Sequence, residues 1–264
     1  MTFQITILGC GSSGGVPRVG GDWGACDPQN PKNRRRRCSI LVERLSGVDR
    51  TVVLVDTSPD LREQLLMTGT KRIDGILMTH AHADHVHGID DVRPLVIKMK
   101  RRIGAYMDPP TSELVCNRFD YIFETPAGSQ YPPLLDPMPL IDGETCEIDG
   151  PAGPIKALPF RLEHGDMEAL GFRFGNVAYT PDLNAVPEQS LEALRGLDIW
   201  IIDALRYTRH PSHLTVEEAL QFIRELRPKR AILTNLHTDL DFERLKAELP
   251  QGVEPAYDGM QIHF

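Results

Sequence analysis

Apolar and polar positions divide the chain into short β-like runs and segments of helical periodicity. Runs rich in Val, Ile and Leu predict strands over residues 3–8, 39–44, 51–55, 75–78, 155–160, 171–174, 177–179, 199–202 and 231–234. Amphipathic segments predict helices over residues 60–67, 89–98, 188–195, 215–226 and 241–248, and the Pro-rich residues 131–139 predict a loop. Two halves that each hold a sheet covered by helices are typical of a layered α/β or α+β fold. We expect residues 1–264 to form one such domain.

Residues 80–85 contain three histidines and an aspartate, directly after the predicted strand 75–78. The segment reads Thr79-His80-Ala81-His82-Ala83-Asp84-His85-Val86-His87-Gly88. Imidazole nitrogens and a carboxylate oxygen suit Zn²⁺, Mn²⁺ or Fe²⁺. A surface loop that is rich in histidine by chance would not explain the fixed position of Asp84 or the matching residues downstream. The run therefore predicts a metal site.

Further candidate ligands follow apolar, strand-like runs later in the chain: His164, Asp182 and His237. A site for two metals needs more ligands than one loop supplies, together with a carboxylate that holds the ions roughly 3.5–4 Å apart. Ligands at the ends of neighbouring strands would meet this need.

With this set of residues the chain resembles the metallo-β-lactamase superfamily, whose signature is the H-x-H-x-D-H run. The resemblance implies a four-layer αββα sandwich and a hydrolase with two divalent ions, Zn²⁺ or Mn²⁺. It implies that His80, His82 and His164 hold one ion, that Asp84, His85 and His237 hold the other, and that Asp182 bridges them. Relatives usually carry the last ligand directly after a Leu-Thr pair, where this chain has Asn235. We therefore predict that His237 is the displaced ligand.

Other segments are similar to the PhnP-type cyclic phosphodiesterases and, more distantly, to tRNase Z. They are the Gly9–Pro17 loop, Arg36-Arg37-Cys38-Ser39, Leu54-Val55-Asp56, Ser212-His213-Leu214-Thr215 and Tyr257-Asp258-Gly259-Met260. By itself, Asp258-Gly259 is typical only of a tight hairpin turn. PhnP-type enzymes also carry a structural zinc on cysteines in the loop that corresponds to residues 20–27. Here only Cys26 is present, and because a structural zinc needs four ligands we expect no such site.

His213 is the candidate general acid. Hydrolysis of a phosphodiester requires a metal-activated water and a proton for the leaving alkoxide, and imidazole titrates in the right range for the second task. The resemblance places His213 in a His-x-Thr pattern before the predicted helix 215–226. The alternative is a histidine near a helix N-cap that only packs. We predict that Asp56 orients the metal loop, and that Asp203 either orients His213 or forms a structural ion pair.

A glycine-rich loop and a run of arginines could each suggest phosphate or nucleotide binding, but neither is sufficient evidence for it. Gly9–Gly14 satisfies G-x-G-x-x-G, but Gly15-Val16-Pro17 follows in place of the helix that a dinucleotide site needs. These glycines predict a tight turn beneath the metal site, where backbone amides can also contact a phosphate. The run Arg34–Arg37 predicts mainly a solvated face, with one arginine available to a substrate phosphate.

Composition favours a soluble enzyme. The chain carries a net charge of −8, is 41% hydrophobic and has five scattered cysteines, a number that does not suggest a disulfide framework. No apolar stretch approaches the ~20 residues of a membrane span, and the N-terminus has no basic n-region. We therefore expect a cytoplasmic protein without a membrane partner, with a homodimer as a candidate assembly.

We predict a phosphodiesterase for small phosphodiesters, including cyclic ones, such as nucleotides or sugar phosphates. Processing of tRNA 3′ ends is an alternative, but no long basic insertion is present to grip tRNA. Hydrolysis of a thioester or lactam also stays open, because the ligands alone do not choose the scissile bond. A non-catalytic role like that of the pyrroloquinoline-quinone biosynthesis protein is disfavoured by the presence of Asp84 and Asp182.

Overall fold

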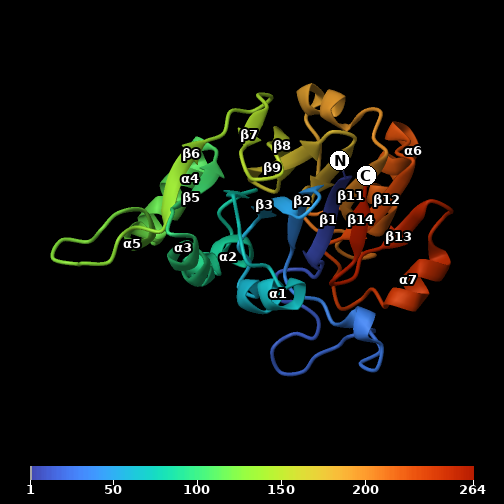
Figure 1. Ribbon diagram of the computed structural model, residues 1–264. Coiled ribbons are helices and arrows are strands. Elements are labelled where there is room, and N and C mark those ends of the chain that lie inside the picture. Colours follow the sequence, from blue (N-terminus) through green and yellow to red (C-terminus); the bar gives the residue numbers. More distant parts are fainter. Residues whose placement is uncertain (1) are drawn as a thin grey trace.

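Two sheets lie face to face, with helices on the outer side of each (Figure 1). The computed structural model describes residues 2–264. The first sheet has the strand order β14-β1-β2-β3-β4-β5-β6, and the second has the order β13-β12-β11-β10-β9-β8-β7. This arrangement confirms the predicted αββα sandwich.

The first sheet consists of β1 (Thr2–Gly9), β2 (Ser39–Ser46), β3 (Asp49–Val55), β4 (Gly75–Leu77), β5 (Ile103–Met107), β6 (Leu135–Pro139) and β14 (Gln261–His263). The second consists of β7 (Cys146–Ile148), β8 (Ile155–His164), β9 (Met167–Phe174), β10 (Val177–Thr180), β11 (Ile199–Asp203), β12 (Arg230–Thr234) and β13 (Val253–Pro255). The α-helices are α1 (Leu61–Thr68), α2 (Ala83–Val86), α3 (Arg93–Met99), α4 (Pro109–Arg118), α5 (Asp120–Phe123), α6 (Val216–Leu226) and α7 (Phe242–Glu248). The 3₁₀ helices are η1 (Pro31–Asn33), η2 (Ile89–Val92) and η3 (Glu188–Leu194).

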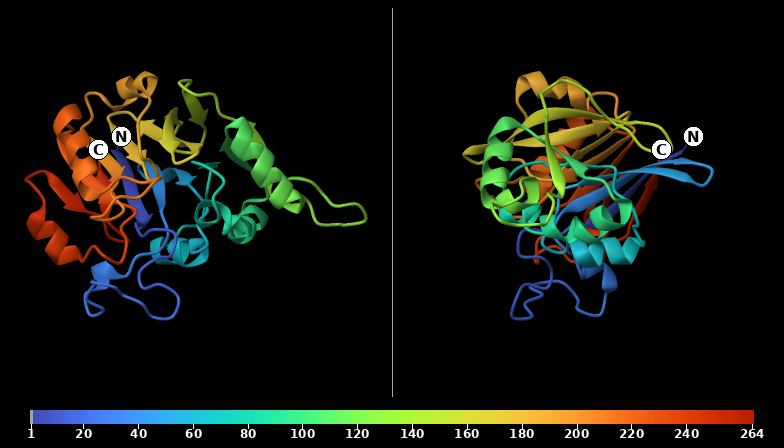
Figure 2. Two further views of the ribbon diagram at one scale, coloured as in Figure 1. Left: turned by 180° about the vertical axis from the view of Figure 1, so that it is seen from behind. Right: turned by 60° about the vertical axis from the view of Figure 1, so that its left-hand side comes forward.

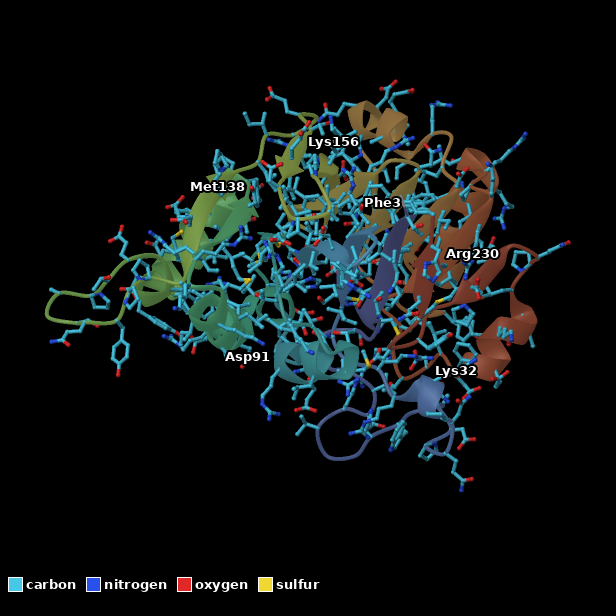
Figure 3. All side chains as sticks on the ribbon, in the orientation of Figure 1. Phe3, Lys32, Asp91, Met138, Lys156 and Arg230 are labelled. Atoms are coloured by element: carbon cyan, nitrogen blue, oxygen red, sulfur yellow. The ribbon has the colours of Figure 1, made fainter. Side chains whose placement is uncertain are left out.

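Buried apolar side chains form a layer between the two sheets, where Val53 of β3 and Ile201 of β11 belong to one cluster. Phe3 of β1, labelled in Figure 3, packs against this cluster. A second cluster lies between the first sheet and helices α1–α5. The third lies between the second sheet and α6, α7 and η3. Each helix buries its apolar stripe against the nearest sheet, which accounts for the four layers.

Parallel pairing in both sheets determines where the site lies. Strands β3 to β6 are parallel to one another, and so are β10 to β13. The carboxyl ends of parallel strands meet at one edge of a sheet, where ligands of open α/β sheets bind. Asp56, His80, Asp182, Asp203 and Asn235 all lie at or just after such strand ends.

Most of the predicted elements are confirmed, with shifted ends, but the region between residues 99 and 149 differs. The predicted 131–139 loop is wrong in its second half, because residues 135–139 form β6 beside β5. Prolines are tolerated there because β6 lies at the edge of the sheet, where a missing N–H breaks no ladder. The predicted helix 89–98 is divided into η2 and α3, and α3 has Pro94 in its first turn.

The first and last strands of the chain are neighbours: β14 pairs with β1, and Figure 2 shows the two ends close together. None of the helices in the described part of the chain combines the length and apolar composition that a membrane span requires.

Candidate metal centre

The loop after β4 carries most of the predicted ligands, and Asp56 holds it in place. The Asp56 carboxylate accepts hydrogen bonds of 2.8 Å from both the backbone N–H and the hydroxyl of Thr79. It also accepts one of 2.7 Å from Nδ1 of His85, on α2. Asp56 lies directly after β3 and is fully buried, so the end of β3 fixes the geometry of the loop after β4.

The ring nitrogens and a carboxylate oxygen of four residues converge on one point. His80 Nε2 lies 2.9 Å from His82 Nδ1, which is 3.3 Å from His164 Nε2. Asp182 Oδ2 lies 3.7 Å from His80 Nε2 and 3.6 Å from His164 Nε2. These four ligand atoms all lie within 4.8 Å of one another.

The other ring nitrogens of the buried histidines are already engaged. His80 Nδ1 lies 3.0 Å from Thr79 Oγ1, and His164 Nδ1 lies 2.7 Å from the carbonyl oxygen of Ser212. Hydrogen bonds of this kind set the tautomer and turn Nε2 toward a metal. Burial lowers the pKa of His80 and of His164, which favours the neutral ring that binds metal. The donor set therefore fits a divalent ion.

A second group shares Asp182 with the first. His85 Nε2 lies 3.5 Å from Asp182 Oδ2 and 3.6 Å from Asp84 Oδ2. Asp182 Oδ2 is thus close to histidines of both groups, which is the position that a bridging carboxylate would need. The bridging role itself stays a prediction.

The structure does not bring His237 into either group. Its Nε2 accepts a hydrogen bond from Arg18 Nη2, and its Nδ1 lies 3.0 Å from Asp239 Oδ1. Asn235 lies closer to the ligands, with Nδ2 3.3 Å from Asp182 Oδ1. Coordination by His237 stays a prediction, and the contacts of its ring do not favour it.

His213 lies beside the cluster and pairs with Asp203. Its Nδ1 is 2.9 Å from Asp203 Oδ2, and its ring centroid is 4.7 Å from that of His164. Burial would lower the pKa of His213, but the Asp203 carboxylate outweighs burial and raises it to about 9. A raised pKa favours the protonated ring that a general acid needs.

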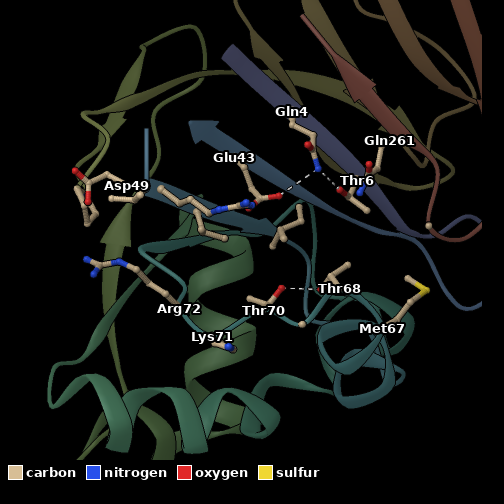
Figure 4. Close-up of a pocket in the computed structure, with 17 residues that line it drawn as sticks. Gln4, Thr6, Glu43, Asp49, Met67, Thr68, Thr70, Lys71, Arg72 and Gln261 are labelled. Atoms are coloured by element: carbon tan, nitrogen blue, oxygen red, sulfur yellow. Dashed lines mark hydrogen bonds and ion pairs between the residues drawn. The ribbon is translucent and has the colours of Figure 1, made fainter. Parts of the chain in front are cut away.

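A cavity of about 260 Å³ opens beside His213 and Asp84. Its wall also contains His210 and the guanidinium groups of Arg18 and Arg206, so two positive charges lie next to the ligands. A larger cavity of about 670 Å³ lies elsewhere, over β1–β3 and the turn after α1 (Figure 4). None of the predicted ligands lines that larger cavity.

The sequence did not reveal the role of Asp258. Its carboxylate accepts hydrogen bonds from the backbone N–H of Cys10, at 3.2 Å, and of Arg36, at 2.8 Å. Leu236 N–H in turn donates to Cys10 O, so Asp258 joins the glycine loop to the segment that carries Asn235. The Asp-Gly pair alone signalled only a turn, and no local pattern could disclose partners so distant in sequence.

The run Arg34–Arg37 is mostly not a solvated face, so that interpretation is wrong. Arg35 is only 2% exposed and donates to the carbonyl oxygen of Leu240 at 2.7 Å. Arg37 pairs with Asp60 at 3.1 Å. Cys26 is buried next to Arg35, with Sγ 3.4 Å from the carbonyl oxygen of Thr238.

We expect Asp258→Ala to lower the free energy of unfolding by about 2–6 kcal/mol. The substitution leaves the N–H groups of Cys10 and Arg36 without their partner, and each such group costs roughly 1–3 kcal/mol. Urea denaturation would measure the loss, with the exposed Asp149→Ala as control. A loss below about 0.5 kcal/mol, as at ordinary surface sites, would contradict the anchoring role.

The chain matches a known protein family and is similar to several proteins of known name or structure. Residues 51–235 match the family model described as a beta-lactamase superfamily domain. The crystal structure of a diphosphatase from the PhnP family superposes with a TM-score of 0.89 at 37% identity, covering 100% of this chain and 98% of the other.

Two curated relatives are longer proteins. An octanoyltransferase of Porphyromonas gingivalis is 32% identical over 98% of this chain and 51% of its own length. A ribonuclease Z of Bradyrhizobium sp. is 28% identical over 54% of this chain and 46% of its own length. The chain thus spans about half the length of the curated relatives it matches.

Proposed function

This chain belongs to the metallo-β-lactamase superfamily, and from that premise we propose that it is a metal-dependent phosphodiesterase. Its substrates would be small phosphodiesters, including cyclic ones, of the nucleotide or sugar phosphate class. The observation that carries the proposal is the His213–Asp203 pair, which lies against the predicted ligand His164. An acid in this place suits a reaction whose leaving group needs a proton.

The proposed ligands divide into two sets that share Asp182. His80, His82, His164 and Asp182 would hold one Zn²⁺ or Mn²⁺ ion, and Asp84, His85 and Asp182 would contribute to a second. When bound, such ions polarise phosphoryl oxygens and lower the pKa of water.

The chain's own residues perform the remaining tasks. His213 donates its proton to the leaving oxygen, while Asp203 fixes the direction of the ring through Nδ1. Arg18 and Arg206 place positive charge in the cavity next to His213, where the phosphate would bind. The 260 Å³ of this cavity suits a small substrate.

A diphosphatase is the second candidate, favoured by 37% identity over almost the whole length of the PhnP-family diphosphatase. Cleavage of a P–O–P bond uses the same attack at phosphorus. It differs in that a phosphate leaves more readily than an alkoxide and depends less on protonation.

A rate screen combined with metal analysis tests the proposal. We expect turnover of bis(p-nitrophenyl) phosphate, of a cyclic nucleotide or of a nucleoside diphosphate sugar by protein loaded with Zn²⁺ or Mn²⁺. EDTA should remove this activity, and added metal should restore it, because the proposed reaction needs the ions. Turnover of a thioester or lactam without any phosphate substrate would reject the proposal.

A further inference from the structure

The two proposed metal positions have unequal donors. Three imidazoles and the Asp182 carboxylate surround the first position, and they suffice to close a tetrahedral site. The second position has one imidazole, from His85, and the carboxylates of Asp84 and Asp182. What completes the second position therefore decides how tightly it binds an ion.

Asn235 is fixed beside Asp182, the carboxylate that the two positions share. It follows β12 with φ of 61°, a left-handed conformation that Asn adopts more readily than most residues, and its side chain is buried. Its amide nitrogen lies 3.3 Å from Asp182 Oδ1 and 3.2 Å from Asp203 Oδ1. A neutral amide thus contacts Oδ1 of Asp182, while Oδ2 lies 3.5–3.7 Å from nitrogens of His80, His85 and His164.

His237 does not supply a second imidazole to the position at Asp84, His85 and Asp182. Both of its ring nitrogens are engaged, one with Arg18 and the other with Asp239. Its backbone oxygen also accepts a hydrogen bond of 3.3 Å from Arg35, a buried residue that holds the segment in place. The ring would have to break these contacts to reach Asp182.

We propose that the two metal positions differ in affinity and in ion preference, and that Asn235 causes the difference. The position at His80, His82 and His164 retains Zn²⁺ tightly. The position at Asp84, His85 and Asp182 exchanges its ion readily and prefers a harder ion such as Mn²⁺. Imidazole-rich sites suit Zn²⁺, whereas carboxylate and carbonyl oxygens suit Mn²⁺. This inference rests on the proposed metal-dependent function.

Metal titration of the wild-type protein tests the inference without any substitution. Metal-free protein would be titrated with Zn²⁺ against a chromophoric chelator, and metal per chain would be measured after dialysis. We expect two Zn²⁺ dissociation constants that differ by about 10–100-fold. When both metals are supplied, we expect each chain to retain one Zn²⁺ and one Mn²⁺. Two Zn²⁺ ions of equal affinity would overturn the inference.

Variants identify the residue responsible. Asn235→His should retain a second Zn²⁺ through dialysis, whereas Asn235→Ala, which only makes space, should not. His237→Ala should leave the Zn²⁺ stoichiometry unchanged. A fall in bound metal in His237→Ala would instead make His237 the displaced ligand and overturn the inference.

Two outcomes separate this inference from the proposed function. If the protein hydrolyses phosphodiesters but its two metal positions have equal Zn²⁺ affinity, only the inference is overturned. A protein that binds no metal would reject the proposed function and the inference together. Thermal unfolding would show whether each variant is folded. If Asn235→His does not fold, the titration of the wild-type protein still tests the inference.

Discussion

Asp182→Ala is expected to release bound metal and to abolish hydrolysis in the same variant. Asp182 Oδ2 lies 3.5–3.7 Å from ligand nitrogens of His80, His85 and His164, so both proposed ions depend on this carboxylate. Metal ions supply several kcal/mol of transition-state stabilisation, which corresponds to a loss of roughly 10³-fold or more in kcat/KM. Metal per chain and kcat/KM would be measured on the same preparation.

Asp166→Ala is the matched control for this loss. Asp166 lies in the exposed turn directly after His164, so its removal should leave metal content and turnover unchanged. If Asp182→Ala kept two metals and full turnover, the assignment of Asp182 as the shared ligand would be wrong.

His213→Ala should retain its metal but lose turnover by about 10²–10⁴-fold on substrates with alkyl or ribosyl leaving groups. The His213 ring supplies a proton and, in the proposed mechanism, is not a ligand. The loss should be much smaller on bis(p-nitrophenyl) phosphate, because p-nitrophenolate leaves without protonation. Steady-state rates on both substrate types, with metal analysis of the variant, would measure the difference.

His263→Ala is the control, because His263 is an exposed histidine on β14 that does not line the cavity next to His213. Equal losses on both substrate types in His213→Ala would show that His213 binds the phosphate instead of protonating the leaving group. Unchanged rates on both would leave His213 a packing residue.

Local patterns predicted the strands with apolar runs, because a short run rich in β-branched and aromatic residues, such as Ile199–Ile202, favours a buried strand. They did not predict β5, which contains glycine and alanine, or β6, which contains prolines. In those strands the pairing between neighbours outweighs the weak propensity of the residues.

At the site, too, residues that are close in sequence were predictable, whereas residues with distant partners were not. His80, His82, Asp84 and His85 are close in sequence, so their spacing alone indicated chemistry. The anchor Asp258 and the buried Arg35 act on partners more than 200 residues away, which no local pattern can disclose. The position of Asn235 against Asp182 likewise depends on the fold.

The proposed ligands come from both sheets. His80 and His82 follow β4 of the first sheet, while His164 ends β8 and Asp182 follows β10 of the second. An ion held by all four would be a cross-link between the two sheets, and an ion that binds only the folded chain stabilises it by about 4 kcal/mol at a thousandfold excess over its Kd. Metal starvation would then act on the amount of protein as well as on its activity, because chains without the cross-link unfold more often and are exposed to proteases.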